Sequence, residues 1–212
     1  MGLRVLVLSA HIDDAECGAG GTVARHIERG DNIQWHTLVR RGYQLPENWP
    51  LDTLELEFQF AMAELGIEDY HLHDFKVDTL DAAITAIRDK LYKLWHDFDP
   101  DMAYIPWNGS RHQDHKAVGE AALQVSWRTT ADVFMYVVVN DYLGFVPNTY
   151  SILADRYYRK KLLVLQCYRS QLHMRPWFTE TLVESHARAF AIFAEGENSH
   201  IEPFIQAKRV LI

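Results

Sequence analysis

The chain has 212 residues, 48% of them hydrophobic, which suffices for one sizeable core and is short for two ordinary domains, so a single domain over residues 1–212 is expected. Its net charge of -8 argues against a nucleic-acid-binding protein, which normally presents a basic face. From the first residues of the sequence we expect no signal peptide, we find no apolar run long enough to span a bilayer, and there are only two cysteines. These features favour a cytoplasmic location and argue against a disulfide framework.

Apolar runs and helical patterns alternate along the first two thirds of the chain. In chain order we expect a strand over 3–9, a helix over 19–29, a strand over 33–39, a helix over 51–65, a strand over 70–75, a helix over 78–98, a strand over 102–106, a helix over 115–128 and a strand over 133–139. Beyond residue 140 the alternation weakens, and only helices over 155–168 and 182–193 are expected. The pattern predicts a Rossmann-like, doubly wound α/β sheet, mostly parallel, with helices on both faces.

The loop after the first strand is acidic rather than glycine-rich. It carries His11, Asp13 and Asp14 where a dinucleotide-binding fold would place its phosphate loop. The glycines that follow do not complete the G-x-G-x-x-G fingerprint, because position 23 is Val23. Carboxylates there would repel a pyrophosphate and attract a cation. Because ligands of such sheets bind beyond the carboxyl ends of the strands, the loop is a candidate for half of a divalent metal site.

A second polar cluster follows the strand over 102–106. It contains His112, Asp114 and His115 at the start of a helix. One histidine and one aspartate from the first loop, with one histidine from the second, would leave a coordination position open for water, as in catalytic zinc sites. Either cluster alone is equally well explained by helix capping or by a solvated loop. Their occurrence at two carboxyl-end loops of one sheet favours the metal site.

These motifs resemble those of the LmbE-like, or PIG-L, zinc-dependent N-deacetylases. The family motif A-H-P-D-D-x-E is similar to residues 10–16, with Ile12 in place of proline, and H-x-D-H is similar to residues 112–115. Weaker similarities are a Gly-Gly-Thr at 20–22, a helical E-x-x-x-A-x-x-x-L-G element at 57–66, and a late element at 161–171 in which Tyr168 replaces histidine. The resemblance runs from about residue 3 to residue 171.

The resemblance implies a role for each motif residue. It implies three zinc ligands: His11, Asp14 and His115. It casts Asp13 as the general base on the metal-bound water and His112 as the group that stabilises the oxyanion or protonates the leaving amine. Asp114 would hold His112 in the required tautomer and raise its pKa. The implied reaction is removal of an N-acyl group, foremost acetyl, from a small amino-sugar-type molecule.

Several alternatives stay open. Fe²⁺ or Co²⁺ would also suit a His-His-Asp site. The family's usual substrate-holding arginine is replaced by Leu54, and the loop after the third strand lacks the usual proline, so a non-sugar N-acyl amine or a non-catalytic binding module are alternatives. Three residues are candidates for substrate contacts: Arg40, Arg41 and Trp107. The turn-rich segment over 140–150 is a candidate substrate loop, and assembly into homo-oligomers is left open.

One further histidine pair has metal-ligand spacing. His71 and His73 are two residues apart on an expected strand, so their side chains share one face. Such histidines pack or cap at strand ends more often than they bind metal.

Overall fold

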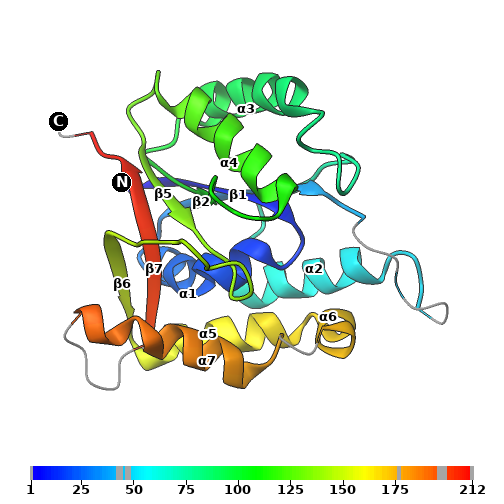
Figure 1. Cartoon of the computed structure of the whole chain (residues 1–212), viewed down its shortest axis with the longest axis vertical. Helices are drawn as coiled ribbons and strands as arrows, with labels where there is room; N and C mark the ends of the chain where they lie inside the picture. The colour runs from blue at the N-terminus through cyan, green and yellow to red at the C-terminus, as the bar shows by residue number, and fades with distance from the viewer. Residues whose placement is uncertain (1, 42–44, 46–48, 176–177, 195–199, 211–212) are drawn as a thin grey trace.

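A seven-stranded sheet runs through the middle of the computed structural model, which describes residues 2–41, 45, 49–175, 178–194 and 200–210 (Figure 1). The strand order is β3-β2-β1-β4-β5-β7-β6. The strands are β1 (Arg4–His11), β2 (Asn32–Val39), β3 (Tyr70–Leu72), β4 (Met102–Pro106), β5 (Asp132–Tyr136), β6 (Thr149–Leu153) and β7 (His200–Lys208). The five strands from β3 to β5 are parallel, which confirms the predicted mostly parallel, Rossmann-like sheet.

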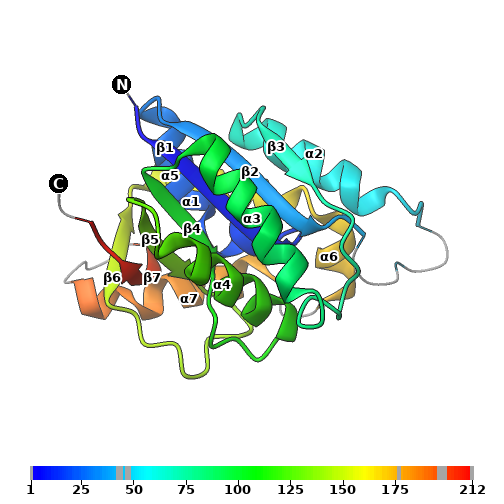
Figure 2. The ribbon, with the colours of Figure 1, turned by 90° about the horizontal axis from the view of Figure 1, so that it is seen from above.

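Helices cover both faces of this sheet (Figures 1 and 2). Helices α3 and α4 pack together on one face, whereas α1, α5 and α2 pack on the other. The helices are α1 (Asp14–Glu28), α2 (Thr53–Leu65), α3 (Ile84–Phe98), α4 (Gln113–Ser126), α5 (Asp155–Gln166), α6 (Arg169–Met174) and α7 (Glu180–Ala189), with a 3-10 turn η1 (Ala191–Ala194). Each face has its own apolar core. Within the described residues, we find no helix of the length and apolarity that crossing a membrane requires.

The C-terminal part of the sheet differs from the sequence-based expectation. Strand β7 lies between β5 and β6 and is antiparallel to both, and neither β6 nor β7 was predicted. The reason is that β7 carries polar residues along its length, including His200, Glu202 and Gln206, and these mask the apolar pattern that identifies a strand. Glu202 is nevertheless buried, because the sheet and α1 enclose it.

Helix α1 begins at Asp14, five residues before the expected start at residue 19. The glycines of this stretch let the helix lie close to the sheet. A Cβ added at Gly18 would clash with the ring of Tyr136, and one added at Gly21 would clash with Leu153. The acidic loop and the Gly-Gly-Thr motif thus form one structural unit, in which close packing of α1 fixes the direction of its N-terminal turn.

The expected helix over 78–98 begins only at Ile84. The preceding segment is held by a different contact: the backbone N–H groups of Asp78 and Leu80 donate to the carboxylate of Asp114, at 2.8 and 3.0 Å. Asp78 has a left-handed backbone, with φ of 60°. These residues are therefore drawn towards α4 and cannot continue the helix.

A buried ion pair ties α5 to β7 and α1. Lys161 Nζ lies 2.8 Å from Glu202 Oε1, and both side chains are buried. The same carboxylate accepts hydrogen bonds from the backbone N–H groups of Gly21 and Thr22, at 2.9 and 2.7 Å. Glu202 is thus surrounded by three donors, of which Lys161 is the only cation recorded among the described residues.

We expect Lys161→Met to lower the free energy of unfolding by about 3–5 kcal/mol, because it leaves the buried carboxylate without its countercharge. Urea denaturation monitored by circular dichroism measures the change. The matched control is Lys160→Met, which removes the neighbouring, half-exposed ion pair with Glu64 and should change stability by less than about 1 kcal/mol. Equal losses in the two variants would contradict the assigned role of the buried pair.

Candidate active site and metal centre

The chain turns sharply where β1 ends and α1 begins. Asp13 adopts a left-handed backbone with φ of 84°, an uncommon conformation for a non-glycine residue. Its side chain makes no capping hydrogen bond to α1, so capping does not explain its presence. The carboxylate of Asp14 instead turns back, and its Oδ2 accepts from the backbone N–H of His11 at 2.8 Å. Strained backbone of this kind is concentrated at functional sites.

His11, Asp14 and His115 converge at the carboxyl ends of β1 and β4. Their atoms His11 Nδ1, Asp14 Oδ2 and His115 Nε2 form a triangle with sides of 3.3, 3.2 and 3.3 Å. For metal–ligand bonds of about 2.0–2.1 Å, ligand atoms of a tetrahedral site lie about 3.3–3.4 Å apart. All three side chains are buried. The donor set and its spacing therefore fit a tetrahedral ion such as Zn²⁺ with one position left for water or substrate.

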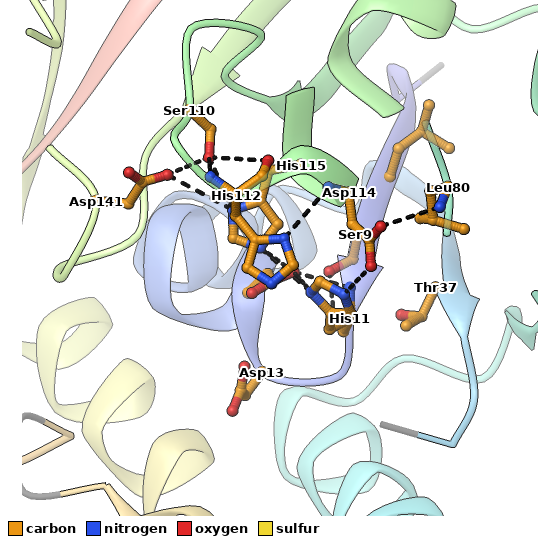
Figure 3. Close-up of polar contacts among 12 residues, drawn as sticks. Ser9, His11, Asp13, Thr37, Leu80, Ser110, His112, Asp114, His115 and Asp141 are labelled. Atoms are coloured by element: carbon orange, nitrogen blue, oxygen red, sulfur yellow. Dashed lines mark hydrogen bonds and ion pairs between the residues drawn. The ribbon is translucent and has the colours of Figure 1, made fainter. Parts of the chain in front are cut away.

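Asp114 orients His11 rather than His112 (Figure 3). Its Oδ2 lies 2.8 Å from His11 Nε2, so a neutral His11 donates its Nε2 hydrogen to Asp114 and presents the Nδ1 lone pair to the triangle. A carboxylate that fixes the outer nitrogen of a ligand histidine is a recurring feature of zinc sites. The Asp114 carboxylate points across to β1 and to the backbone of Leu80, so it is the backbone N–H of Asp114 that contacts His112.

His112 occupies the N-cap of α4 beside the triangle. Its Nδ1 accepts from the backbone N–H of Asp114 at 3.2 Å, so a neutral His112 carries its hydrogen on Nε2. Burial lowers the pKa of His112, and the neighbouring His115 and His11 lower it further. Asp114 raises this pKa, as expected, but the net shift is downward. The carboxylate paired with its Nε2 is that of Asp78, at 3.8 Å.

His115 has an outer carboxylate as well (Figure 3). Its Nδ1 lies 3.4 Å from Ser110 Oγ and 3.9 Å from Asp141 Oδ2, and Ser110 Oγ donates to Asp141. The backbone N–H of Arg111 also donates to Asp141, at 3.1 Å. Asp141 lies in the segment over 140–150 that the sequence suggested as a substrate loop, but no motif marked it as a partner of His115.

The electrostatics of the site favour a positive charge at the triangle. Burial alone would lower the pKa of His11, but Asp114 and Asp14 raise it to about 9. Burial alone would raise the pKa of Asp14, yet His115 and His11 hold it well below its usual range. A site that stabilises an imidazolium between two carboxylates also suits a metal cation at the same position.

Asp13 lies beside the triangle and faces a cationic partner. Arg175 Nη1 donates to Asp13 Oδ2 at 3.2 Å. Burial raises the pKa of Asp13, whereas the charge of Arg175 lowers it. A cavity of about 260 Å³ opens here, lined by His11, Asp13, Asp14, Cys17, His112, His115, Val138, Asn140, Arg175 and Phe178. Sequence reasoning missed Arg175 and Phe178, which come from the connection between α6 and α7.

A model of the family described as GlcNAc-PI de-N-acetylase, PIG-L, matches residues 6–126, which include both halves of this site. The chain belongs to this family. It is 28% identical over 172 residues to the uncharacterized deacetylase YaiS of Escherichia coli K12, over 78% of this chain and 90% of that protein.

Solved structures share the PIG-L fold of this chain. The N,N'-diacetylchitobiose deacetylase from Pyrococcus horikoshii matches with a TM-score of 0.80 at 17% identity, over 95% of this chain and 82% of that one. GalB, the 4-carboxy-2-hydroxymuconate hydratase from Pseudomonas putida KT2440, matches with a TM-score of 0.77 at 17% identity, over 99% of this chain and 98% of that one. Because one fold carries a deacetylase and a hydratase, the reaction must be argued from the site.

Two helical elements of the PIG-L pattern have structural roles. The carboxylate of Glu57 accepts from the backbone N–H and the hydroxyl of Ser170, at 2.7 and 2.6 Å, and so joins α2 to α6. Glu16 accepts a hydrogen bond from the Tyr168 hydroxyl, and burial raises the pKa of Glu16 to about 8. Glu16 therefore connects the first motif to the late element and does not belong to the ligand triangle.

The three residues suggested for substrate contacts lie elsewhere. Arg40 pairs with Glu55 and Asp74, at 3.8 and 3.7 Å, and Arg41 is exposed. Trp107 packs edge-on against Phe145, and it is not among the described residues that line the cavity. From the suggested substrate loop over 140–150, Asn140 does line the cavity, next to Asp141.

Proposed function

We propose that this chain is a zinc-dependent N-deacetylase that removes the acetyl group from a small amino-sugar-type substrate. The observation that carries the proposal is the triangle of His11, Asp14 and His115, whose sides of 3.2–3.3 Å suit tetrahedral Zn²⁺, with Asp13 beside it. Membership of a deacetylase family and similarity to a diacetylchitobiose deacetylase support the amide as the bond that is cleaved.

When bound, Zn²⁺ supplies a Lewis acid and lowers the pKa of a coordinated water. The protein's part is to move the protons. Asp13 accepts the proton of the attacking water, while Arg175 holds its Oδ2 and so fixes the direction of the carboxylate. The same proton is the one that the departing amine needs, because an amine leaves only when it is protonated. Asp13 thereby acts first as base and then as acid.

His112 stabilises the negative charge on the acyl oxygen by hydrogen bonding. Its Nδ1 already accepts from the Asp114 backbone, so Nε2 is the nitrogen that donates. The lowered pKa of His112 favours a neutral donor over an imidazolium, and a metal cation nearby would lower this pKa further. One such donor supplies about 2.7–4 kcal/mol in other hydrolases.

The cavity has the size of a small substrate. At about 260 Å³ it lies just below the range of about 300–1,000 Å³ that is usual for drug-sized ligands, so it suits one sugar ring with its acyl group. Asn140 and Arg175 offer hydrogen-bond donors to hydroxyl groups, whereas Val138 and Phe178 offer apolar contact. A non-sugar N-acyl amine of similar size is the alternative substrate.

Metal analysis combined with an acetate-release assay tests the proposal. The protein is purified without added metal and assayed on N-acetylglucosamine and on its chitobiose dimer, before and after chelation and after Zn²⁺ is restored. We expect about one zinc per chain and release that chelation abolishes and zinc restores. Zinc without release from sugars, but with release from simple N-acetyl amines, would favour the alternative substrate. Failure to take up any transition metal would refute the proposal.

A further inference from the structure

Strand β3 forms one edge of the sheet (Figure 2), and a second histidine cluster lies there. His36 on β2 pairs in register with His71 on β3, and their rings are nearly parallel, with centroids 4.6 Å apart. His73, just beyond β3, meets His36 head-on: His36 Nδ1 and His73 Nε2 lie 3.0 Å apart with the rings nearly coplanar. None of these residues belongs to the candidate active site.

The hydrogen bonds around His36 fix which of its nitrogens carries the lone pair. Gln34 donates its amide hydrogen to Asp69 Oδ2 at 3.0 Å, which turns Gln34 Oε1 towards His36 Nε2, also at 3.0 Å. His36 therefore donates from Nε2 and keeps a lone pair on Nδ1. His71 Nε2 is held in the same way by Asp69 Oδ1 at 2.9 Å. The carboxylate on His71 matches that on His11 at the proposed zinc site, whereas the outer nitrogen of His36 is held by an amide oxygen.

Charges and burial keep these imidazoles available as ligands at neutral pH. Burial lowers the pKa of His36 to about 3, and His71, His73 and Lys90 add to the effect. Burial also lowers the pKa of His73 to about 4, with Lys90 on α3 as the next cause. A metal ion binds only the unprotonated imidazole, so protons do not compete for these nitrogens near pH 7.

We propose that His36 and His73 form a second binding site for a divalent transition-metal ion, with Zn²⁺, Ni²⁺ or Cu²⁺ as the ions that suit imidazole donors. His36 Nδ1 and His73 Nε2 are the two protein ligands, and water completes the coordination. The rings turn and separate from 3.0 Å to the roughly 3.3 Å of a tetrahedral edge, while the hydrogen on His73 Nε2 moves to its Nδ1.

Such an ion would link the short strand β3 to β2. Strand β3 has only three residues, Tyr70–Leu72, and His73 follows it directly. The carboxylates of Asp69 and Asp74 lie close enough to favour a cation, whereas Lys90 and Arg40 oppose it. The balance of these charges predicts a site weaker than the catalytic one.

Ni²⁺ titration of protein that carries a single equivalent of zinc, followed by calorimetry, tests the second site. We expect one additional equivalent to bind to the natural chain, at least tenfold more weakly to His73→Gln, and more tightly to Lys90→Gln, which removes the opposing charge. His96→Gln is the matched control, because His96 is an exposed histidine on α3, and it should bind like the natural chain. Unchanged affinity in His73→Gln would overturn the proposal.

A second measurement does not depend on the folding of a variant. In ¹⁵N-histidine spectra of the natural chain, substoichiometric Cu²⁺ should broaden the signals of His36 and His73 before that of His96. Broadening of His96 first would show adventitious surface binding and would refute the site.

Discussion

Asp14→Ala is expected to lower metal affinity more than about 100-fold, since loss of an outer-shell partner already lowers it by about 10–100-fold. Asp14 Oδ2 is one corner of the proposed ligand triangle. It lies 3.3 Å from His11 Nδ1 and 3.2 Å from His115 Nε2. Alanine removes that ligand and one of the two carboxylates that stabilise a cation there. Competition with a chromophoric chelator measures the affinity, and acetate release should fall in parallel.

Asp114→Asn serves as a comparison variant, for which we expect a smaller loss of metal affinity than for Asp14→Ala. Asn keeps an acceptor oxygen for His11 Nε2 at nearly the same place but removes the charge, so metal affinity should fall only by about 10–100-fold. Added zinc should restore activity to Asp114→Asn at concentrations that leave Asp14→Ala inactive. If both variants bound zinc like the natural chain, the assignment of the metal centre would be wrong.

Asp13→Asn should retain the metal and lose turnover by about 10²–10⁴-fold, the usual contribution of a general base. Asparagine is the suitable replacement because it tolerates the left-handed backbone that Asp13 adopts, with φ of 84°, whereas alanine would add strain. The amide cannot accept the proton of water at neutral pH, so chemistry slows while ligand geometry is kept.

The decisive control for Asp13→Asn is its metal content, which should remain at about one ion per chain. Its melting temperature should also stay close to that of the natural protein, although the contact with Arg175 at 3.2 Å loses its charge. Full turnover in a variant with normal metal content would contradict the assignment of Asp13 as the general base. Loss of metal together with turnover would instead assign Asp13 to the ligand set.

The sequence alone determined the parallel part of the sheet and the place of the site. The continuous apolar run of β1 requires burial on both faces, and seven of its eight residues are buried. Because all parallel strands end at one edge, the polar loops after β1 and β4 were expected to meet there if the two strands are neighbours, as they are. Position thus grouped a histidine and an aspartate of the first loop with a histidine of the second, and the resemblance to the family selected His11, Asp14 and His115 among them.

Only the tertiary structure decided which groups contact one another within the site. The resemblance to the family implied that Asp114 holds His112, but the carboxylate of Asp114 reaches His11 and the backbone of Leu80, because α4 meets both β1 and the segment before α3 there. Arg175 lies 162 residues from its partner Asp13 along the chain, and no local pattern signals that contact. Helical and strand periods arise from neighbouring residues, whereas such contacts arise from how whole elements pack.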